Sequence, residues 1–130
     1  MAFDKEIVKN HWIETSNQDQ KAMLGLFDLK LYSYSLFIGH LAVEKYLKAI
    51  YVDKFAQNAP FIHNLFRLAE LSGLELTEEL SDKLDTISTF NIEARYDDYK
   101  KEFYNKCTKD FTEKWINNIR EVIEWLKSKH

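Results

Sequence analysis

Glycine and proline are scarce in this chain, which holds three glycines and one proline among 130 residues. Both residue types interrupt helices, and no window alternates apolar and polar residues with the period of two that strands show. Long apolar runs are also missing: Lys45 and Lys48 interrupt the most apolar stretch, whereas a membrane-spanning helix needs about 20 apolar residues. These absences predict an all-α protein that does not span a membrane.

Cysteine and excess positive charge are lacking as well. The single cysteine, Cys107, excludes an internal disulfide and a cysteine-rich zinc site, and no glycine-rich phosphate loop is present. The formal net charge of −3 provides no overall basic field, so charge alone predicts no tight non-specific binding to nucleic acid, although a local basic patch stays open. The first residues do not have the layout of a signal peptide. We expect a cytoplasmic protein without a metal or other cofactor.

The chain is rich in apolar residues: hydrophobic residues make up 45% of it and aromatic residues 15%. This composition argues against disorder, and the length suits a single domain over residues 1–130 with one core. Apolar periodicity and capping residues predict helices over 3–28 (as one helix or two), 33–55 after a connection near 29–32, 63–71, 77–90 and 111–127. Residues 95–106 are the least regular. Because the connections are short, we expect an up-and-down four- to five-helix bundle.

The most informative stretch is 37–50, a helix that is apolar almost all round, as expected for a helix enclosed by others. It nevertheless carries His40, Glu44 and Lys48, which fall at i, i+4 and i+8 and therefore share one face. Charges on such a helix are rare unless they are paired or used. Two interpretations stay open: a structural ion pair at the margin of the core, or a polar cleft floor where Lys48 binds a phosphate.

Two further positions are candidates for a site. His63 follows the loop that holds the only proline, and it either caps and packs locally or reaches the face that carries Glu44. Arg95 lies beside Tyr96, a combination that provides phosphate pairing, stacking and cation–π contact with bases. The alternative for Arg95 is an ion pair with Glu44 or with one of the two aspartates that follow Tyr96, which would fasten a loop.

Aromatic residues are too numerous for the interior of a small bundle, with nine phenylalanines, seven tyrosines and three tryptophans. We expect part of them at the surface, where they suit a dimer interface or a docking partner. The residues expected there include Tyr32, Tyr34, Phe103, Tyr104 and Trp125.

An ordered set of motifs spans nearly the whole chain. In order they are Trp12 with Asp19 and Ala22, Tyr32, Phe37, the run HLAVEKYLKA at 40–49, HNL at 63–65, ARYDD at 94–98 and IEWL at 123–126. The set resembles the HEPN superfamily, small helical domains associated with nucleotide or RNA functions. The resemblance implies a helical bundle that is commonly a homodimer. Many such proteins are encoded beside a minimal nucleotidyltransferase, with which they form a complex or a toxin–antitoxin pair.

Some HEPN proteins are metal-independent ribonucleases with an Arg-x4-6-His motif. After Arg95 the corresponding positions hold Lys100, Lys101 and Glu102, so the histidine of that motif is missing. Such a mechanism needs an imidazole near the RNA 2′-hydroxyl, because only histidine titrates near neutrality without perturbation. The departure from the motif favours a binding module over an enzyme.

The sequence therefore predicts a HEPN-like homodimer that binds nucleotide or RNA, or docks onto a nucleotidyltransferase partner. The expected ligand contacts are Arg95, Tyr96, Lys48 and His63, with Glu44 orienting Arg95 or His63 through a charge-assisted hydrogen bond. One alternative is a ribonuclease with an atypical site, in which His63 or His40 replaces the missing histidine. Another is a purely structural oligomerisation domain.

Overall fold

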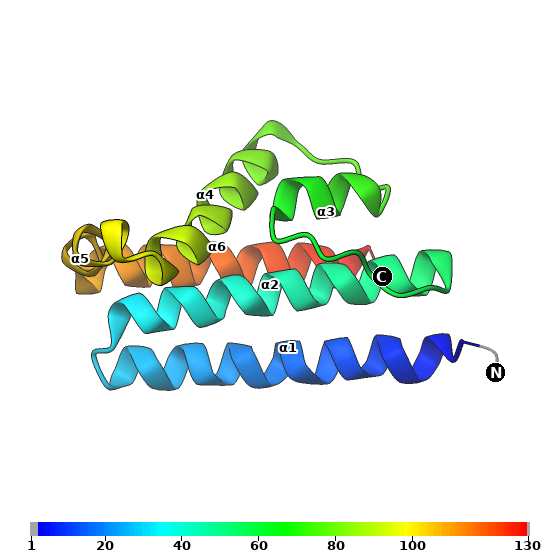
Figure 1. The fold of residues 1–130 in the computed structure, drawn as a ribbon, viewed down its shortest axis with the longest axis horizontal. Helices are drawn as coiled ribbons and strands as arrows, with labels where there is room; N and C mark the ends of the chain where they lie inside the picture. Colours follow the sequence, from blue (N-terminus) through cyan, green and yellow to red (C-terminus); the bar gives the residue numbers. More distant parts are fainter. Residues whose placement is uncertain (1–2, 130) are drawn as a thin grey trace.

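A computed structural model describes residues 3–129, which form six helices (Figure 1). The helices are α1 (Lys5–Asp28), α2 (Tyr32–Phe55), α3 (Leu65–Leu71), α4 (Glu78–Arg95), α5 (Asp97–Lys106) and α6 (Lys109–Ser128). This part of the chain has no strand, and the prediction of an all-α bundle is confirmed. No helix within residues 3–129 is long and apolar enough to cross a membrane.

Helix α2 is the centre of the bundle, because it packs against each of the other five helices. Helices α1 and α2 form an antiparallel hairpin, and α4 crosses the bundle obliquely (Figure 1). Helix α6 packs along α2 and runs in the same direction as α2 (Figure 1). The intervening helices α3 to α5 return the chain to the end of the bundle where α2 begins, which explains this parallel arrangement.

The caps explain where several helices begin. Asp4, Asn64, Thr77 and Thr108 each accept a hydrogen bond from a backbone N–H in the first turn of α1, α3, α4 and α6, respectively. The start predicted at Thr77 is therefore confirmed. Helix α1 is one continuous helix, because the Ser16 hydroxyl is buried and donates to the Ala42 carbonyl at 2.7 Å rather than capping a second helix.

The sequence marks residues 95–106 as least regular, and 97–106 of these fold into α5. Two aspartates in the first turn favour a helix N-terminus there. The segment has a single buried anchor, Phe103, whose ring centroid lies 5.6 Å from that of Phe90. Phe103 is 2% exposed, so its predicted place at the surface is wrong. Tyr34 and Tyr104 are on the surface as predicted, 64% and 72% exposed, whereas Tyr32 and Trp125 are partly buried.

Gly39 marks a close approach of α1 and α6 to α2. A Cβ atom at this position would lie 2.7 Å from both Ile119 Cδ1 on α6 and Met23 Sδ on α1. The absence of a side chain thus lets both α1 and α6 approach α2 closely at this position. This packing positions the polar face of α2 that carries the site described next.

Candidate functional site

The polar side chains of α2 lie inside the molecule. His40 is fully buried, and Glu44 and Lys48 are nearly so. Lys48 Nζ donates to Glu44 Oε2 at 3.1 Å and lies 5.1 Å from the centre of the Trp12 ring on α1. The amine of Lys48 is therefore engaged by the carboxylate and covered by an aromatic ring. The ion-pair interpretation applies to Glu44 and Lys48.

The other carboxylate oxygen of Glu44, Oε1, lies near two histidine side chains. Glu44 Oε1 lies 3.0 Å from His63 Nδ1 and 3.6 Å from His40 Nε2. His63 stands just before α3, and this segment is held to α4 by a 2.9 Å hydrogen bond from the Leu65 N–H to Ser88 Oγ. The His63 side chain is 57% exposed, although its carboxylate partner is buried. Glu44 thus joins a buried lysine to an exposed imidazole.

His40 has a different environment from His63. Both of its ring nitrogens are buried without a hydrogen-bond partner in the described part of the chain. Burial lowers the pKa of His40 to about 4, against the opposing influence of the Glu44 carboxylate and the backbone of His63. The charges of His63 and Arg95 also lower this pKa. His40 is a neutral core residue at physiological pH.

Arg95 lines a cleft of about 580 Å³ between the start of α2, the end of α4 and α5. Its Nη1 donates to Asn91 Oδ1 at 3.2 Å, and the residue remains exposed. The cleft is bordered by aromatic rings and three cations, with no carboxylate in its lining: Ser33, Tyr34, Phe37, Ala94, Arg95, Lys100, Lys101, Phe103 and Tyr104. We call this the Arg95 cleft. Its composition suits an anionic ligand that also presents a flat or apolar group.

The Arg95 cleft adjoins the Glu44 cluster along α2. Phe37 lines the cleft, and its ring stacks near His40, with centroids 6.3 Å apart. His40 in turn contacts Glu44, one helical turn further along the same face. The cleft and the cluster are therefore consecutive along one face of α2, with the His40 ring between them.

The structure brings together only part of the predicted ligand set. Glu44, Lys48 and His63 meet directly, and Glu44 orients His63 rather than Arg95. Arg95 forms no ion pair within residues 3–129, so the described contacts do not include the loop-fastening pair. Tyr96 is exposed at the N-terminus of α5 and is not among the residues that line the cleft.

Sequence reasoning missed most of the cleft wall. Tyr34 and Phe37 are spaced i, i+3 at the start of α2, a signal for a shared face that was available in the sequence. Lys100 and Lys101 belong to a run of mixed charges, a pattern that does not by itself distinguish a binding wall from a solvated surface. Their role at the cleft became visible only once α5 was placed against α2.

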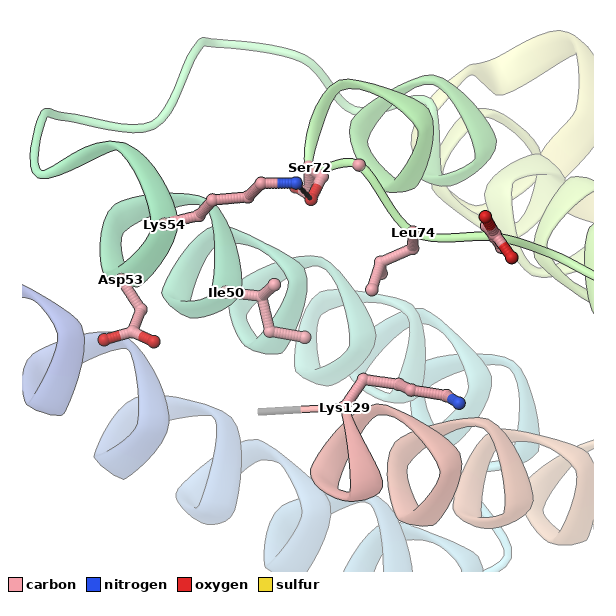
Figure 2. A pocket seen from close by; sticks show the side chains of 8 residues that line it. Ile50, Asp53, Lys54, Ser72, Leu74 and Lys129 are labelled. Carbon is pink, nitrogen blue, oxygen red and sulfur yellow. Dashed lines mark hydrogen bonds between the residues drawn. The ribbon is translucent and has the colours of Figure 1, made fainter.

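A second cavity of about 440 Å³ lies between the end of α2 and the turn after α3 (Figure 2). Lys54 extends toward Ser72 and donates to its carbonyl at 3.4 Å (Figure 2). Asp53 forms ion pairs with Lys5 and Lys9 on α1. This cavity mixes charges of both signs, Asp53 and Glu75 with Lys54 and Lys129, so it matches an anionic ligand less well than the Arg95 cleft does.

Comparison with known proteins identifies the family. The family model described as "HEPN domain" matches residues 10–129. No curated protein matches the chain. Among solved structures, the crystal structure of TT1696 from Thermus thermophilus is similar, with a TM-score of 0.79 and 18% identity, over 94% of this chain and 98% of that chain. At this level of identity, the structural likeness shows the fold alone.

Proposed function

The chain belongs to the HEPN domain family, and on this premise we propose that it is a nucleotide- or RNA-binding module whose ligand lies in the Arg95 cleft. One observation carries the proposal: the cleft combines Arg95, Lys100 and Lys101 with the exposed rings of Tyr34 and Tyr104, without a carboxylate in its lining. The cleft gathers these cations although the net charge of the chain is −3.

The chemistry of the lining matches the two parts of a nucleotide. The guanidinium of Arg95 has the planar donor geometry that pairs with two phosphate oxygens, and the lysines add point charges. Tyr34 and Tyr104 offer rings on which bases stack. A volume of about 580 Å³ falls within the range of small-molecule sites, roughly 300–1,000 Å³. The cleft therefore suits one nucleotide of a longer single strand.

The other residues predicted to contact a ligand have different roles in this proposal. His63 and Tyr96 are exposed and would meet nucleotides on either side of the one in the cleft. Lys48 supports Glu44 instead of meeting phosphate directly, because its amine is already bonded inside the bundle. Glu44 holds the His63 ring in place through the 3.0 Å contact.

Binding of fluorescent single-stranded RNA, followed by anisotropy, tests the proposal, with calorimetry for mononucleotides. Arg95→Ala should weaken RNA binding about 10- to 100-fold, the effect of losing charge-assisted hydrogen bonds of about 1.5–3 kcal/mol. Arg67→Ala is the matched control, since Arg67 is an exposed arginine that pairs with Glu70 away from the cleft. Absence of binding, or equal binding by the two variants, would refute the proposal.

A second candidate function is docking in a homodimer or onto a nucleotidyltransferase partner, as in a toxin–antitoxin pair. The observation that favours it is exposed apolar surface outside the cleft, including Phe61 at 98% exposure, Ile7 and Leu29. Light scattering would detect a dimer of this chain. Co-purification with a nucleotidyltransferase encoded beside it would detect the complex, and a monomer without a partner would exclude this function.

A further inference from the structure

Helix α5 forms one wall of the Arg95 cleft, but few of its side chains attach it to the bundle. It provides Lys100, Lys101, Phe103 and Tyr104 to the lining of the cleft. Phe103 is the only buried residue of α5, and all its other residues are exposed. Opening of this wall would therefore remove a single apolar side chain from the core, whereas unfolding of the bundle would expose the whole core.

The polar contacts between α5 and the other helices are also few. Lys106 Nζ lies 3.6 Å from Glu93 Oε2 on α4, and both side chains are partly exposed. Lys100 forms its ion pair at 3.5 Å with Asp97, which belongs to α5 itself. Within residues 3–129, no other side chain of α5 forms an ion pair or a hydrogen bond. Because exposed ion pairs contribute little to stability, the attachment of α5 depends mainly on its one buried ring.

Both ends of α5 are separated from the neighbouring helices by non-helical residues. Tyr96 alone lies between α4 and α5, with an extended backbone (φ −95°, ψ 128°) and no side-chain cap on α5. Cys107 and Thr108 lie between α5 and α6, and Thr108 caps α6. A helix of ten residues is too short to be stable by itself, since isolated helices below about 12–15 residues are marginal in water. Helix α5 can therefore open without unwinding α4 or α6.

The charges of the cleft favour opening in the absence of a ligand. Arg95 on α4 faces the same cleft as Lys100 and Lys101 on α5, and no carboxylate lines it. These like charges repel one another when α5 is in place, whereas a phosphate between the two walls attracts both. A ligand that contacts both walls thus binds the closed state more tightly, and such a difference in affinity shifts a conformational equilibrium.

We propose that α5 is a hinged wall of the Arg95 cleft, which opens locally in the free protein and is held closed by the phosphates of a bound single strand. The proposal rests on the proposed function, because that function identifies the ligand as RNA. In the open state the two lysines and Tyr104 leave the cleft, while Arg95 remains on α4. The complete site exists only in the closed state, so the apparent affinity for RNA depends on the stability of α5.

Hydrogen–deuterium exchange of the full chain tests the proposal with and without single-stranded RNA. In the free protein, amides of α5 should exchange on the order of 100-fold or more faster than those of residues 40–50 in α2, which exchange only when the bundle unfolds. RNA at ten times its Kd should slow the exchange of α5 about tenfold. Amides at the start of α1, which lies at the opposite end of the bundle, should not respond (Figure 1).

A matched pair of substitutions tests whether α5 opens by itself. Glu102 is exposed on α5 and does not line the Arg95 cleft. Glu102→Gly and Glu102→Ala remove the same charge, but glycine has a much lower helix propensity than alanine. Amides of α5 should exchange about fivefold faster in Glu102→Gly than in Glu102→Ala, the factor that this difference in propensity corresponds to. Exchange at residues 40–50 should be the same in both variants.

The possible results separate this proposal from the proposed function. Acceleration of α5 and of residues 40–50 by the same factor in Glu102→Gly would show that α5 opens only with the whole bundle, which overturns the hinged wall. RNA that binds by anisotropy without slowing the exchange of α5 would also overturn it and leave the binding function intact. Absence of RNA binding would refute the proposed function and the role of the strand in closure, and exchange of the two variants without RNA then decides alone whether α5 opens locally.

Discussion

At the scale of single residues, the site depends on one carboxylate with several polar neighbours. Glu44 contacts Lys48 and His40 on its own helix and His63 from the segment before α3. The burial of Glu44 and Lys48 strengthens the contact between them, since little water competes for it, and makes the loss of either partner costly. Glu44 therefore links the stability of the bundle to the geometry of the site.

Removal of this carboxylate should destabilise the fold. Glu44→Ala leaves the ammonium of Lys48 buried without its partner, and we expect the free energy of unfolding to fall by about 3–5 kcal/mol. Urea denaturation measures this change. Glu70→Ala, which removes an exposed carboxylate 2.7 Å from Arg67, should cost less than about 1 kcal/mol. Equal effects of the two substitutions would show that Glu44 is not buried as described.

His40 should make stability depend on pH. Burial lowers its pKa from 6.5 to about 4, so on acidification the unfolded chain takes up a proton before the folded one does. The free energy of unfolding should be highest above pH 6.5 and fall by on the order of 3 kcal/mol as pH drops toward 4. His40→Leu should flatten this dependence in urea titrations, whereas His11→Leu should not. An unchanged acid slope in His40→Leu would contradict the assignment.

The residue types of the site could be found in the sequence, but their pairing could not. The spacing of His40, Glu44 and Lys48 on one helix predicts a shared face, which the structure confirms. Glu44 and His63 are 19 positions apart in the sequence, and a loop lies between them. The distance between their side chains therefore depends on how α3 packs. For this reason the sequence left both histidines open as candidates.

At the scale of helices, α2 is the central element, because the other five helices pack around it. Its apolar circumference predicts this central position. Helix α5 was not predictable in the same way. It presents a mostly polar surface with Phe103 as its only buried residue, so its place depends on contacts with α4 and α2.

Close packing on α2 predicts opposite effects for two glycines in helices. Gly39→Ala should lower the free energy of unfolding by about 1–3 kcal/mol, because the new methyl group would meet Ile119 and Met23 at 2.7 Å. Gly25→Ala on α1 meets no atom within 4 Å and should raise it by about 0.5–1 kcal/mol. Thermal and urea unfolding of both variants check this pair. A stabilising Gly39→Ala would contradict the packing of α1 and α6 on α2.

At the scale of the whole molecule, the charge distribution sets how the protein meets nucleic acid. The net charge of −3 predicts little long-range attraction, whereas the Arg95 cleft gathers three cations locally. We therefore expect the affinity for single-stranded RNA to fall with salt concentration only as steeply as a few phosphate contacts predict.

Three phosphate contacts predict a slope of log affinity against log salt concentration of about −2, since each contact on a single strand contributes about −0.7. The double substitution Lys100→Gln with Lys101→Gln should reduce the slope to about −0.7. Lys21→Gln with Lys114→Gln, two exposed lysines outside the cleft, should leave it unchanged. Anisotropy titrations at several salt concentrations measure the slopes. Equal slopes in both double variants would place the contacts elsewhere.

The overall bundle was predictable from helical periodicity and scarce glycine and proline, and the family from motifs spread along the chain. The cleft was not, because its walls come from three helices whose angles depend on tertiary packing. The central claim is that this cleft, together with the His63 side chain held by Glu44, forms one ligand site.

Amide chemical-shift mapping by NMR during titration with single-stranded RNA tests this claim most directly. The account predicts that the largest changes fall at residues 33–37, at 94–104 and at His63. Changes centred instead on the cavity beside Lys54 and Ser72, or no changes at saturating RNA, would contradict it.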